Sequence, residues 1–140
     1  MFNDAEGVLY AEIADFDNDS FRRLTISDGS NDNNISIMFT TTENQIVCFV
    51  NDGGSTQASI TSYLDTNEFN KIAVKYKEND FSVYINGILK GQDTNCTVPS
   101  GLNTLNFDSG TGTADLYGKV KDVRYFDRAL TDAELIELTT

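Results

Sequence analysis

Residues 71–91, KIAVKYKENDFSVYINGILKG, contain two runs in which apolar and polar side chains alternate, separated by a polar corner. Successive side chains of a strand point to opposite faces, so each run predicts a strand with one buried face. The Asn86-Gly87 pair supplies the positive φ of a tight hairpin turn, which leads into a third extended run at Ile88–Gly91. This stretch alone predicts part of an antiparallel sheet.

Similar short runs recur about every 8–14 residues along the chain of 140 residues, and a single proline interrupts it. Clusters of Asn, Asp, Gly, Ser and Thr separate the runs, as in SDGSNDNN and NDGGST. This spacing is typical of a β-sandwich or a barrel, and the length predicts one domain spanning residues 1–140. In chain order, the predicted strands are Val8–Ala14, Arg23–Ser27, Asn34–Thr40, Gln45–Val50, Gln57–Ser62, Lys71–Lys77, Phe81–Asn86, Leu102–Phe107 and Gly118–Phe126.

Helical signals are confined to the C-terminal end. In LTDAEL, residues 130–135, Thr131 is placed to act as the N-cap and Glu134 stands three residues later, which is the arrangement of a capping box. Leu130 and Leu135 are spaced to form a hydrophobic staple across this start. We therefore predict one short C-terminal helix.

The formal net charge is −12, from 22 acidic and 10 basic residues. Nucleic-acid binding requires a basic surface, and anionic membranes repel a chain of this charge, so neither partner is expected. No apolar run is long enough for a membrane span, and the N-terminus MFNDAEG lacks a signal-peptide pattern, so the signal of an exported domain would lie elsewhere. Solubility explains the acidity, and cation binding by loop carboxylates is the alternative.

The two cysteines lie in different settings. Cys48 is in the apolar run QIVCFV and Cys96 in the polar loop QDTNCTV, and the chain has no histidine. Their spacing suits no metal site, and chemistry by a Cys-His pair is impossible. We favour two unpaired cysteines, one buried and one not, over a disulfide between them.

Two segments of the second half resemble a known family. EFNKIAVKYKENDFSVYINGILKG is similar to the core of laminin-G-like modules of the concanavalin A-like lectin/glucanase superfamily, with an aromatic, a V-A-V run, a polar corner and Y-V-N-G. YGKVKDVRYFDRALTDAEL, residues 117–135, resembles the closing G-x-I-D-E-V-R-I-Y-N-R-A-L-T-x-x-E of that family. Together they cover about the last 70 residues, and the first half fits by its strand count.

The resemblance implies an all-β fold, a jelly roll of two antiparallel sheets, used most often to bind glycans or proteins. EGVLYAEIA, followed by a Ser-Asp-Gly corner at 27–29, is also similar to modules attached to bacteriophage tail and fibre proteins. An extracellular or virion-associated location is therefore expected. The chain departs from the pattern because it has no tryptophan and opens almost directly on this strand, as a domain excised from a longer protein would.

In such a sandwich, one set of alternating apolar side chains should be buried between the two sheets. We expect the buried set to be Ile72, Val74, Phe81, Val83, Ile85, Leu105, Phe107, Val120 and Val123.

Catalysis is not expected. Retaining glucanases of the superfamily place two carboxylates on one face of a strand, as in E-x-D-x-E. Here Glu12 and Asp15 are three residues apart, so strand alternation sends them to opposite faces. Glu134 and Glu137 fall on the predicted helix, and the lack of histidine removes the base or ligand of triad and metal chemistry.

Asp15, Asp17 and Asp19, in the run DFDND, have the alternate spacing of acids that opens many calcium loops. The glycine and glutamate of an EF-hand are replaced by Ser20 and Ile26, so this is not an EF-hand. A solvated turn is the favoured interpretation. Calcium is the alternative, because some laminin-G-like domains bind it at loop rims.

Sugar binding requires a stacking ring and polar groups. Alternation places Tyr84 on the outer face of a sheet, beside Ala73 or Lys75 of the adjacent strand, and Tyr10 is similarly out of phase with its apolar neighbours. These rings either stack on sugars or are covered by a neighbouring strand, loop or subunit. Loop tips offer a second location, with polar side chains at Asn31, Asp32, Asn33, Asn51, Asp52, Asp108 and Ser109.

The sequence thus predicts a non-catalytic module that binds a glycan, carried on a larger extracellular or phage-tail protein that allows homo-oligomers. The alternative is a structural module that trimerises or caps a fibre, which would show an apolar outer patch and bind no ligand.

Overall fold

The computed structural model describes residues 2–16 and 20–140. Over these residues the chain forms strands and one C-terminal helix, and the predicted all-β class is confirmed. Their bounds are β1 (Glu6–Asp15), β2 (Arg22–Ser27), β3 (Asn34–Phe39), β4 (Gln45–Asp52), β5 (Ser55–Tyr63), β6 (Asn70–Lys77), β7 (Phe81–Ile85), β8 (Ile88–Asp93), β9 (Thr104–Asn106), β10 (Gly118–Phe126) and α1 (Asp132–Thr139).

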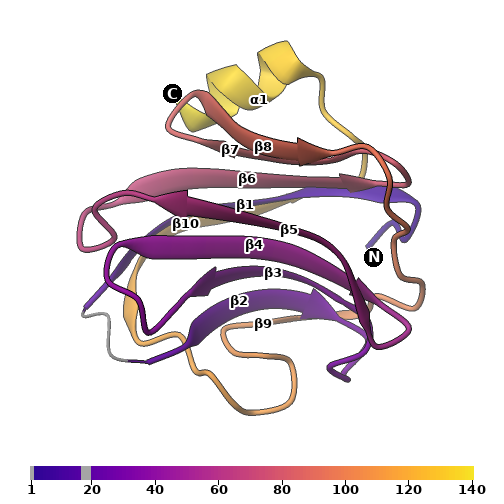
Figure 1. Cartoon of the computed structure of the whole chain (residues 1–140), viewed down its shortest axis with the longest axis horizontal. Helices are drawn as coiled ribbons and strands as arrows, with labels where there is room; N and C mark the ends of the chain where they lie inside the picture. The colour runs from indigo at the N-terminus through magenta and orange to yellow at the C-terminus, as the bar shows by residue number, and fades with distance from the viewer. Residues whose placement is uncertain (1, 17–19) are drawn as a thin grey trace.

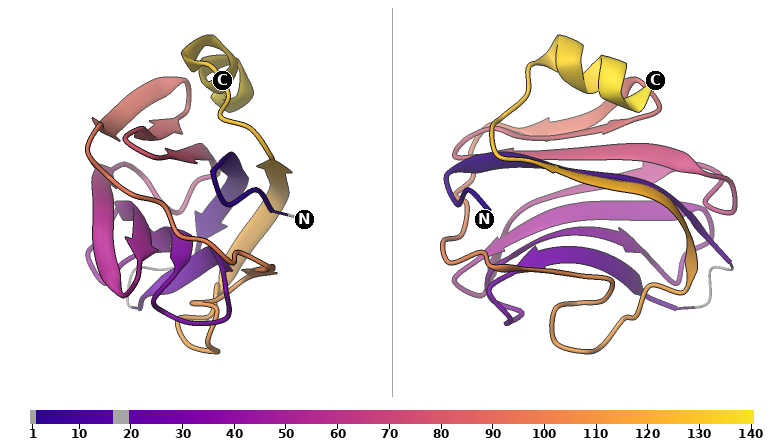
Figure 2. Two further views of the ribbon diagram at one scale, coloured as in Figure 1. Left: turned by 90° about the vertical axis from the view of Figure 1, so that its right-hand side faces the viewer. Right: turned by 180° about the vertical axis from the view of Figure 1, so that it is seen from behind.

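The strands form two five-stranded antiparallel sheets. The first sheet has the order β10-β1-β6-β7-β8 and the second has the order β5-β4-β3-β2-β9. The sheets face each other in Figure 1, and the left view of Figure 2 shows α1 on the side of the first sheet that faces away from the second. The predicted two-sheet jelly-roll sandwich is confirmed.

The hairpin turn predicted between β7 and β8 is also confirmed. Asn86 and Gly87 have φ values of 52° and 82°, and Ile85 pairs directly with Ile88. Two residues with positive φ match the twist of the flanking strands. The Asn86 side chain also accepts a hydrogen bond from the Lys71 backbone N–H at 3.0 Å, which ties the turn to β6.

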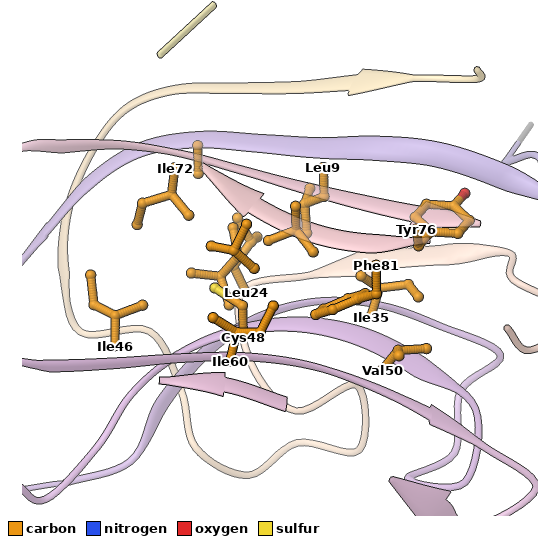
Figure 3. Packing of buried hydrophobic residues seen from close by; sticks show 14 of the residues in the cluster. Leu9, Leu24, Ile35, Ile46, Cys48, Val50, Ile60, Ile72, Tyr76 and Phe81 are labelled. Atoms are coloured by element: carbon orange, nitrogen blue, oxygen red, sulfur yellow. The ribbon is translucent and has the colours of Figure 1, made fainter. Parts of the chain in front are cut away.

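The core lies between the sheets and consists of the inward side chains of both. Figure 3 shows part of it, with Leu9 and Ile72 of the first sheet pointing toward Ile46 and Ile60 of the second. Of the predicted core set, all five members on β6 and β7 have no exposed surface, and Leu105 and Val123 pack against the core while partly buried. The five are Ile72, Val74, Phe81, Val83 and Ile85.

Two core predictions are wrong. Phe107 is 47% exposed because β9 ends at Asn106, so the ring follows a loop instead of a strand. Val120 is 46% exposed, although it pairs with the buried Ile13. It lies on β10, an edge strand that has a neighbour on one side only.

Both cysteines are buried and unpaired. Cys48 lies within the core among the side chains of Figure 3, and burial raises the pKa of its thiol. Cys96 is 3% exposed, which corrects the expectation that it lies at the surface. Its backbone N–H donates to Asn79 Oδ1 at 3.2 Å, which folds the polar loop down onto the β6–β7 corner.

The C-terminal helix begins as predicted. Thr131 is the N-cap, its hydroxyl accepts a hydrogen bond from the Glu134 N–H, and the Glu134 carboxylate accepts one from the Thr131 N–H. The same carboxylate takes two hydrogen bonds from the Arg128 guanidinium, at 3.0 and 2.6 Å. Hydrogen bonds from Arg128 and from the Thr131 N–H lower the pKa of Glu134 to about 2. Over the described residues, no helix is long and apolar enough to cross a membrane.

Helix α1 packs on the outer face of the first sheet through Leu135, which has no exposed surface. Replacing Leu135 by Ala should lower the free energy of unfolding by roughly 2–5 kcal/mol, because the truncation removes buried apolar contacts and leaves a void. The neighbouring Ile136 is 44% exposed, so Ile136→Ala should change the free energy of unfolding by only about 0.5 kcal/mol. Urea denaturation of both variants measures the difference, and equal effects would contradict this packing.

Candidate functional site

The outer face of the first sheet was one predicted location for a sugar-stacking ring. Tyr84 pairs with Ala73 as expected, and its ring lies on the outer face. Helix α1 covers that face, however, and Tyr84 and Tyr10 are only 4% and 3% exposed. The two rings pack in a small apolar cluster with Leu130, Leu135 and their sheet neighbours. The expectation of exposed stacking rings is therefore wrong, and the alternative of a covered face is the one observed.

Lys75, the predicted polar companion of Tyr84, is also buried, with 5% exposure. Its ammonium group lies 2.8 Å from the Asp80 carboxylate. Burial acts to raise the pKa of Asp80, but hydrogen bonds from Lys75 and Gln92 outweigh it and the pKa is lowered. A lysine that is buried and paired in this way is part of the scaffold, and its donors are not available to a ligand.

Tyr84 provides a pH test of the helix contact. Burial, together with a hydrogen bond to Asp132 on α1, raises the pKa of Tyr84 from 10.0 to about 12. A raised pKa means that the folded state favours the neutral phenol, so this contribution to stability is complete below pH 10 and is lost as the pH rises through 12. The free energy of unfolding should therefore fall in that range.

The measurement compares the wild type with Tyr84→Phe, which keeps the ring and removes the titrating group. The difference between their phenolate absorption curves should show one tyrosine ionising well above pH 10, and urea denaturation should show a steeper loss of unfolding free energy between pH 10 and pH 12 in the wild type. A Tyr84 that ionises near pH 10, with no steeper loss in the wild type, would count against the contact.

The predicted rim residues Asn31, Asn33, Asn51 and Asp52 do come together, at the end of the second sheet where the β2–β3 loop meets the β4–β5 turn. Asn33 Oδ1 accepts from the Gly53 N–H at 2.9 Å, and the Asn31 carbonyl accepts from Asn51 Nδ2 at 3.4 Å. We call these four residues the rim. The rim is held by hydrogen bonds between two loops, so its polar groups are fixed in place.

The other three loop-tip predictions fall in different settings. Asp32 is exposed beside the rim, where its carbonyl accepts from the Gly54 N–H at 3.0 Å. Asp108 lies in the β9–β10 loop and accepts from the Gly110 N–H at 2.6 Å. Ser109 is only 1% exposed, and its hydroxyl is 2.8 Å from that of Thr113, so it braces the loop from within.

The outer face of the second sheet is polar, in contrast to that of the first. The cross-strand row Thr25, Ser36, Phe49 and Ser59 lies on this face, because the inward positions on either side of it belong to the core. No helix covers this face, and Phe49 is partly exposed. Thr25 and Ser36 have no exposed surface, and the β9–β10 loop packs on β2, so the part of this face that is open to water lies toward β4 and β5.

Arg23 is the central charged group on this face. Its Nη2 donates to Ser36 Oγ at 2.7 Å and lies 3.4 Å from Asn34 Oδ1, and its guanidinium carbon is 5.0 Å from the centre of the Phe49 ring. Asn34 pairs directly with Asn51, which joins this group to the rim. We call Arg23, Asn34, Ser36, Phe49 and Asn51 the Arg23 surface.

The guanidinium of Arg23 is not neutralised by an acidic partner among the described residues. Among the described residues, no carboxylate lies within ion-pair distance of it, and its buried Nε has no hydrogen-bond partner. Burial lowers the pKa of Arg23 and the nearby Asp108 acts in the opposite direction, but an arginine remains charged at neutral pH. The Arg23 surface therefore combines a positive charge, neutral hydrogen-bonding groups and an aromatic ring.

The β9–β10 loop forms one wall of this surface. The Ala114 carbonyl accepts from the Arg23 N–H at 2.9 Å, and Gly110 lies so close to Ser27 that a Cβ there would come within 2.6 Å of its hydroxyl oxygen. The loop thus needs a glycine at this approach, and its packing on β2 brings Asp108 toward Arg23.

Sequence reasoning missed Arg23 and Phe49 as site residues. Alternation within RRLTIS and QIVCFVND does place both on the outer face, opposite Leu24 and Cys48. That pattern was available as a signal. It could not show that the two residues meet, because they lie on strands separated by β3.

A protein-family model of the laminin-G type, described as the concanavalin A-like lectin/glucanases superfamily, matches residues 13–136. The chain belongs to this superfamily. No curated protein sequence matches it. The superfamily match confirms the laminin-G-like resemblance and extends it into the first half of the chain.

Several solved structures share the fold of this chain. The carbohydrate-binding module CBM40 of the Ruminococcus gnavus IT-sialidase, bound to α2,3-sialyllactose, is 15% identical with a TM-score of 0.79, and the match covers 99% of this chain and 84% of that one. CBM66 from Bacillus subtilis is 15% identical with a TM-score of 0.51, covering 67% and 62% of the two chains. A botulinum neurotoxin type C structure, described by its interaction with two ganglioside molecules, is 18% identical with a TM-score of 0.63, covering 95% and 34%.

The predicted calcium run of this concanavalin A-like domain is only partly described, because Asp17 and Asp19 lie outside the described residues. Asp15 is 2% exposed, and its carboxylate lies 3.2 Å from Arg22 Nε and accepts from the Phe16 N–H at 2.9 Å. Within residues 2–16 and 20–140, no group of three or more acidic, cysteine or histidine side chains is arranged to hold a metal.

Calcium binding by Asp15, Asp17 and Asp19 stays a prediction. If these residues hold calcium, millimolar calcium should raise the melting temperature and a chelator should lower it, because a ligand selective for the folded state stabilises it by mass action. The control is Asp65→Asn, in a different loop, which should not alter the response. Identical melting curves with calcium and with chelator would leave the run as a solvated turn.

Proposed function

We propose that this concanavalin A-like domain is a non-catalytic carbohydrate-binding module whose glycan lies on the Arg23 surface, next to the rim. One observation carries the proposal: no helix lies on the polar outer face of the second sheet, where the partly exposed Arg23, which has no carboxylate partner among the described residues, lies beside the partly exposed Phe49 ring. Carbohydrate-binding modules among the solved structures of this fold support the same role.

The chemistry of the Arg23 surface suits a sugar that carries a carboxylate. A guanidinium presents paired donors that match a carboxylate, and such charge-assisted hydrogen bonds are stronger than neutral ones. Asn34 and Ser36 have no exposed surface and hold the Arg23 guanidinium in place. The partly exposed Asn51 can exchange hydrogen bonds with hydroxyl groups, and the Phe49 ring can contact the apolar face of a sugar ring. Because solved structures of this fold are described with sialyllactose, sialylated glycans are the first class to test.

The test is binding of 3′-sialyllactose, with lactose as its uncharged counterpart, measured by calorimetry and by backbone amide shifts. Sialyllactose should shift Asn34, Phe49 and Asn51. Arg23→Ala should weaken its binding by about tenfold or more, since hydrogen bonds to a charged group are worth about 1.5–3 kcal/mol. The control is Lys77→Ala, which removes an equal charge from an exposed position on β6 in the other sheet.

Unchanged affinity in Arg23→Ala, with the fold intact by circular dichroism, would show that the glycan binds elsewhere. A glycan array on the isolated domain then separates recognition from the alternative, a structural or oligomerisation module. If the domain binds no glycan on the array, the structural alternative is favoured. The covering of the first sheet by α1 already removes one outer patch that a structural module would need.

Context and catalysis belong to the same proposal. We propose that the domain works outside the cell or on a virion, as part of a longer adhesion protein such as a phage tail or fibre protein, with homo-oligomers formed through the parent chain. The resemblance of its strands to such modules supports this context. Glu12 and Asp15 form no catalytic pair, since Asp15 pairs with Arg22, which supports a binding role.

A further inference from the structure

A cleft of about 500 Å³ lies between α1 and the outer face of the first sheet, on the β1 and β10 side. It exists because α1 contacts β6, β7 and β8 but leaves the opposite edge of that sheet uncovered. The right view of Figure 2 shows α1 above β10 and β1. Ligand sites commonly fall in the range of about 300–1,000 Å³, so this α1 cleft has room for one or two sugar rings.

The floor of the α1 cleft is apolar. It is formed by Tyr10, Phe126, Leu130 and Leu138, which join the cluster that fixes the helix on the sheet. Phe126 and Leu138 are partly exposed, so part of this floor is open to a ligand. The helix contact braces these side chains, so the floor is formed before a ligand arrives.

The walls are charged, but their basic groups are already occupied. Arg124 Nη2 lies 2.8 Å from Asp122 Oδ2. Arg128 makes the two short hydrogen bonds to Glu134, and Lys71 Nζ donates to the Thr140 carbonyl at 3.0 Å. The cleft therefore offers no uncommitted cation to an anionic ligand.

Two carboxylates that line the cleft can still accept hydrogen bonds from a ligand. Glu137 lines the cleft from α1, and its side chain makes no hydrogen bond or ion pair with another described residue. Glu12 lines it from β1, where Lys121 Nζ is at 3.8 Å and is itself mostly exposed. A carboxylate can accept hydrogen bonds from two neighbouring hydroxyl groups, and an arginine has five N–H donors, so Arg124 and Arg128 retain donors beyond those given to Asp122 and Glu134.

We propose that the α1 cleft is a second glycan site, separate from the Arg23 surface, which takes an uncharged sugar. An apolar floor with planar acceptors and donors around it matches a sugar ring, which has an apolar face and a belt of hydroxyls. The unpaired carboxylate of Glu137 and the weakly paired carboxylate of Glu12 repel a carboxylated sugar, so the two sites differ in the charge they accept. The cleft extends the proposed glycan-binding role but shares no residue with the Arg23 surface.

The experiment titrates the ¹⁵N-labelled domain with three uncharged sugars, lactose, maltose and N-acetylglucosamine, each to about 50 mM, because contacts of this extent correspond to dissociation constants of about 1 mM. At least one should shift the amides of Arg124, Glu137 and Thr140. Free N-acetylneuraminic acid should leave those amides unchanged. No shift at the cleft with any of the three sugars would overturn the proposal.

Two variants locate the site. Glu137→Ala should weaken binding of the active sugar by about three- to tenfold, the worth of one or two hydrogen bonds. The matched control is Glu78→Ala, an exposed glutamate at the β6–β7 corner, which should have no effect. Leu138→Trp, which fills the cleft, should abolish the shifts. Binding that survives Glu137→Ala unchanged would overturn the proposal, whether or not Leu138→Trp folds.

The readouts separate this proposal from the one for the Arg23 surface. If sialyllactose shifts the amides of Asn34 and Phe49 but no uncharged sugar shifts the amides of the cleft, only the proposal for the cleft is wrong. If the uncharged sugars shift the cleft and Arg23→Ala does not alter sialyllactose binding, only the Arg23 surface fails.

Discussion

The packing of Leu130 and Leu135 on Tyr10 and Tyr84 decides which parts of this sandwich stay open. The first sheet has apolar side chains on both faces, because Val8 and the two tyrosines point away from the core that its alternate residues form. A sheet of this kind needs a cover on each side, and the second sheet and α1 supply the two covers. The second sheet has polar outward residues and no helix on its outer face, so the proposed binding surface lies there.

Electrostatics gives the two proposed sites opposite preferences within one strongly acidic chain. The net charge of −12 repels anions over long range, so a carboxylated sugar is attracted only where a local cation is exposed and uncommitted. Arg23 comes nearest to this condition, because it is partly exposed and its hydrogen-bond partners Ser36 and Asn34 are neutral. In the α1 cleft, each arginine has an acidic partner, so the general repulsion is not offset there.

The sequence predicted the features that depend on local pattern. Strand alternation, the Asn86-Gly87 turn and the Thr131 capping box involve residues that are neighbours in the chain, and all are confirmed. Alternation also placed Tyr84 on the outer face opposite Ala73, but it could not show what lies on top of that face. The cover is a helix about 50 residues further along, and no periodic pattern reports a contact over that distance. The prediction that Phe107 is buried was wrong for a related reason, since its apolar run extends beyond the last hydrogen-bonded residue of β9.

The β9–β10 loop that walls the Arg23 surface also determines how the second sheet ends. Strand β9 is only three residues long, and beyond it the Arg23 N–H is taken by Ala114, a residue with a φ of 53°. Gly110 and Gly112 on the same loop also have positive φ, a conformation that no continuing strand adopts. This margin of the sheet therefore offers no straight ladder of free N–H and C=O groups to another chain. When many copies of the domain are held at high local concentration, lateral aggregation by strand addition is blocked along this border.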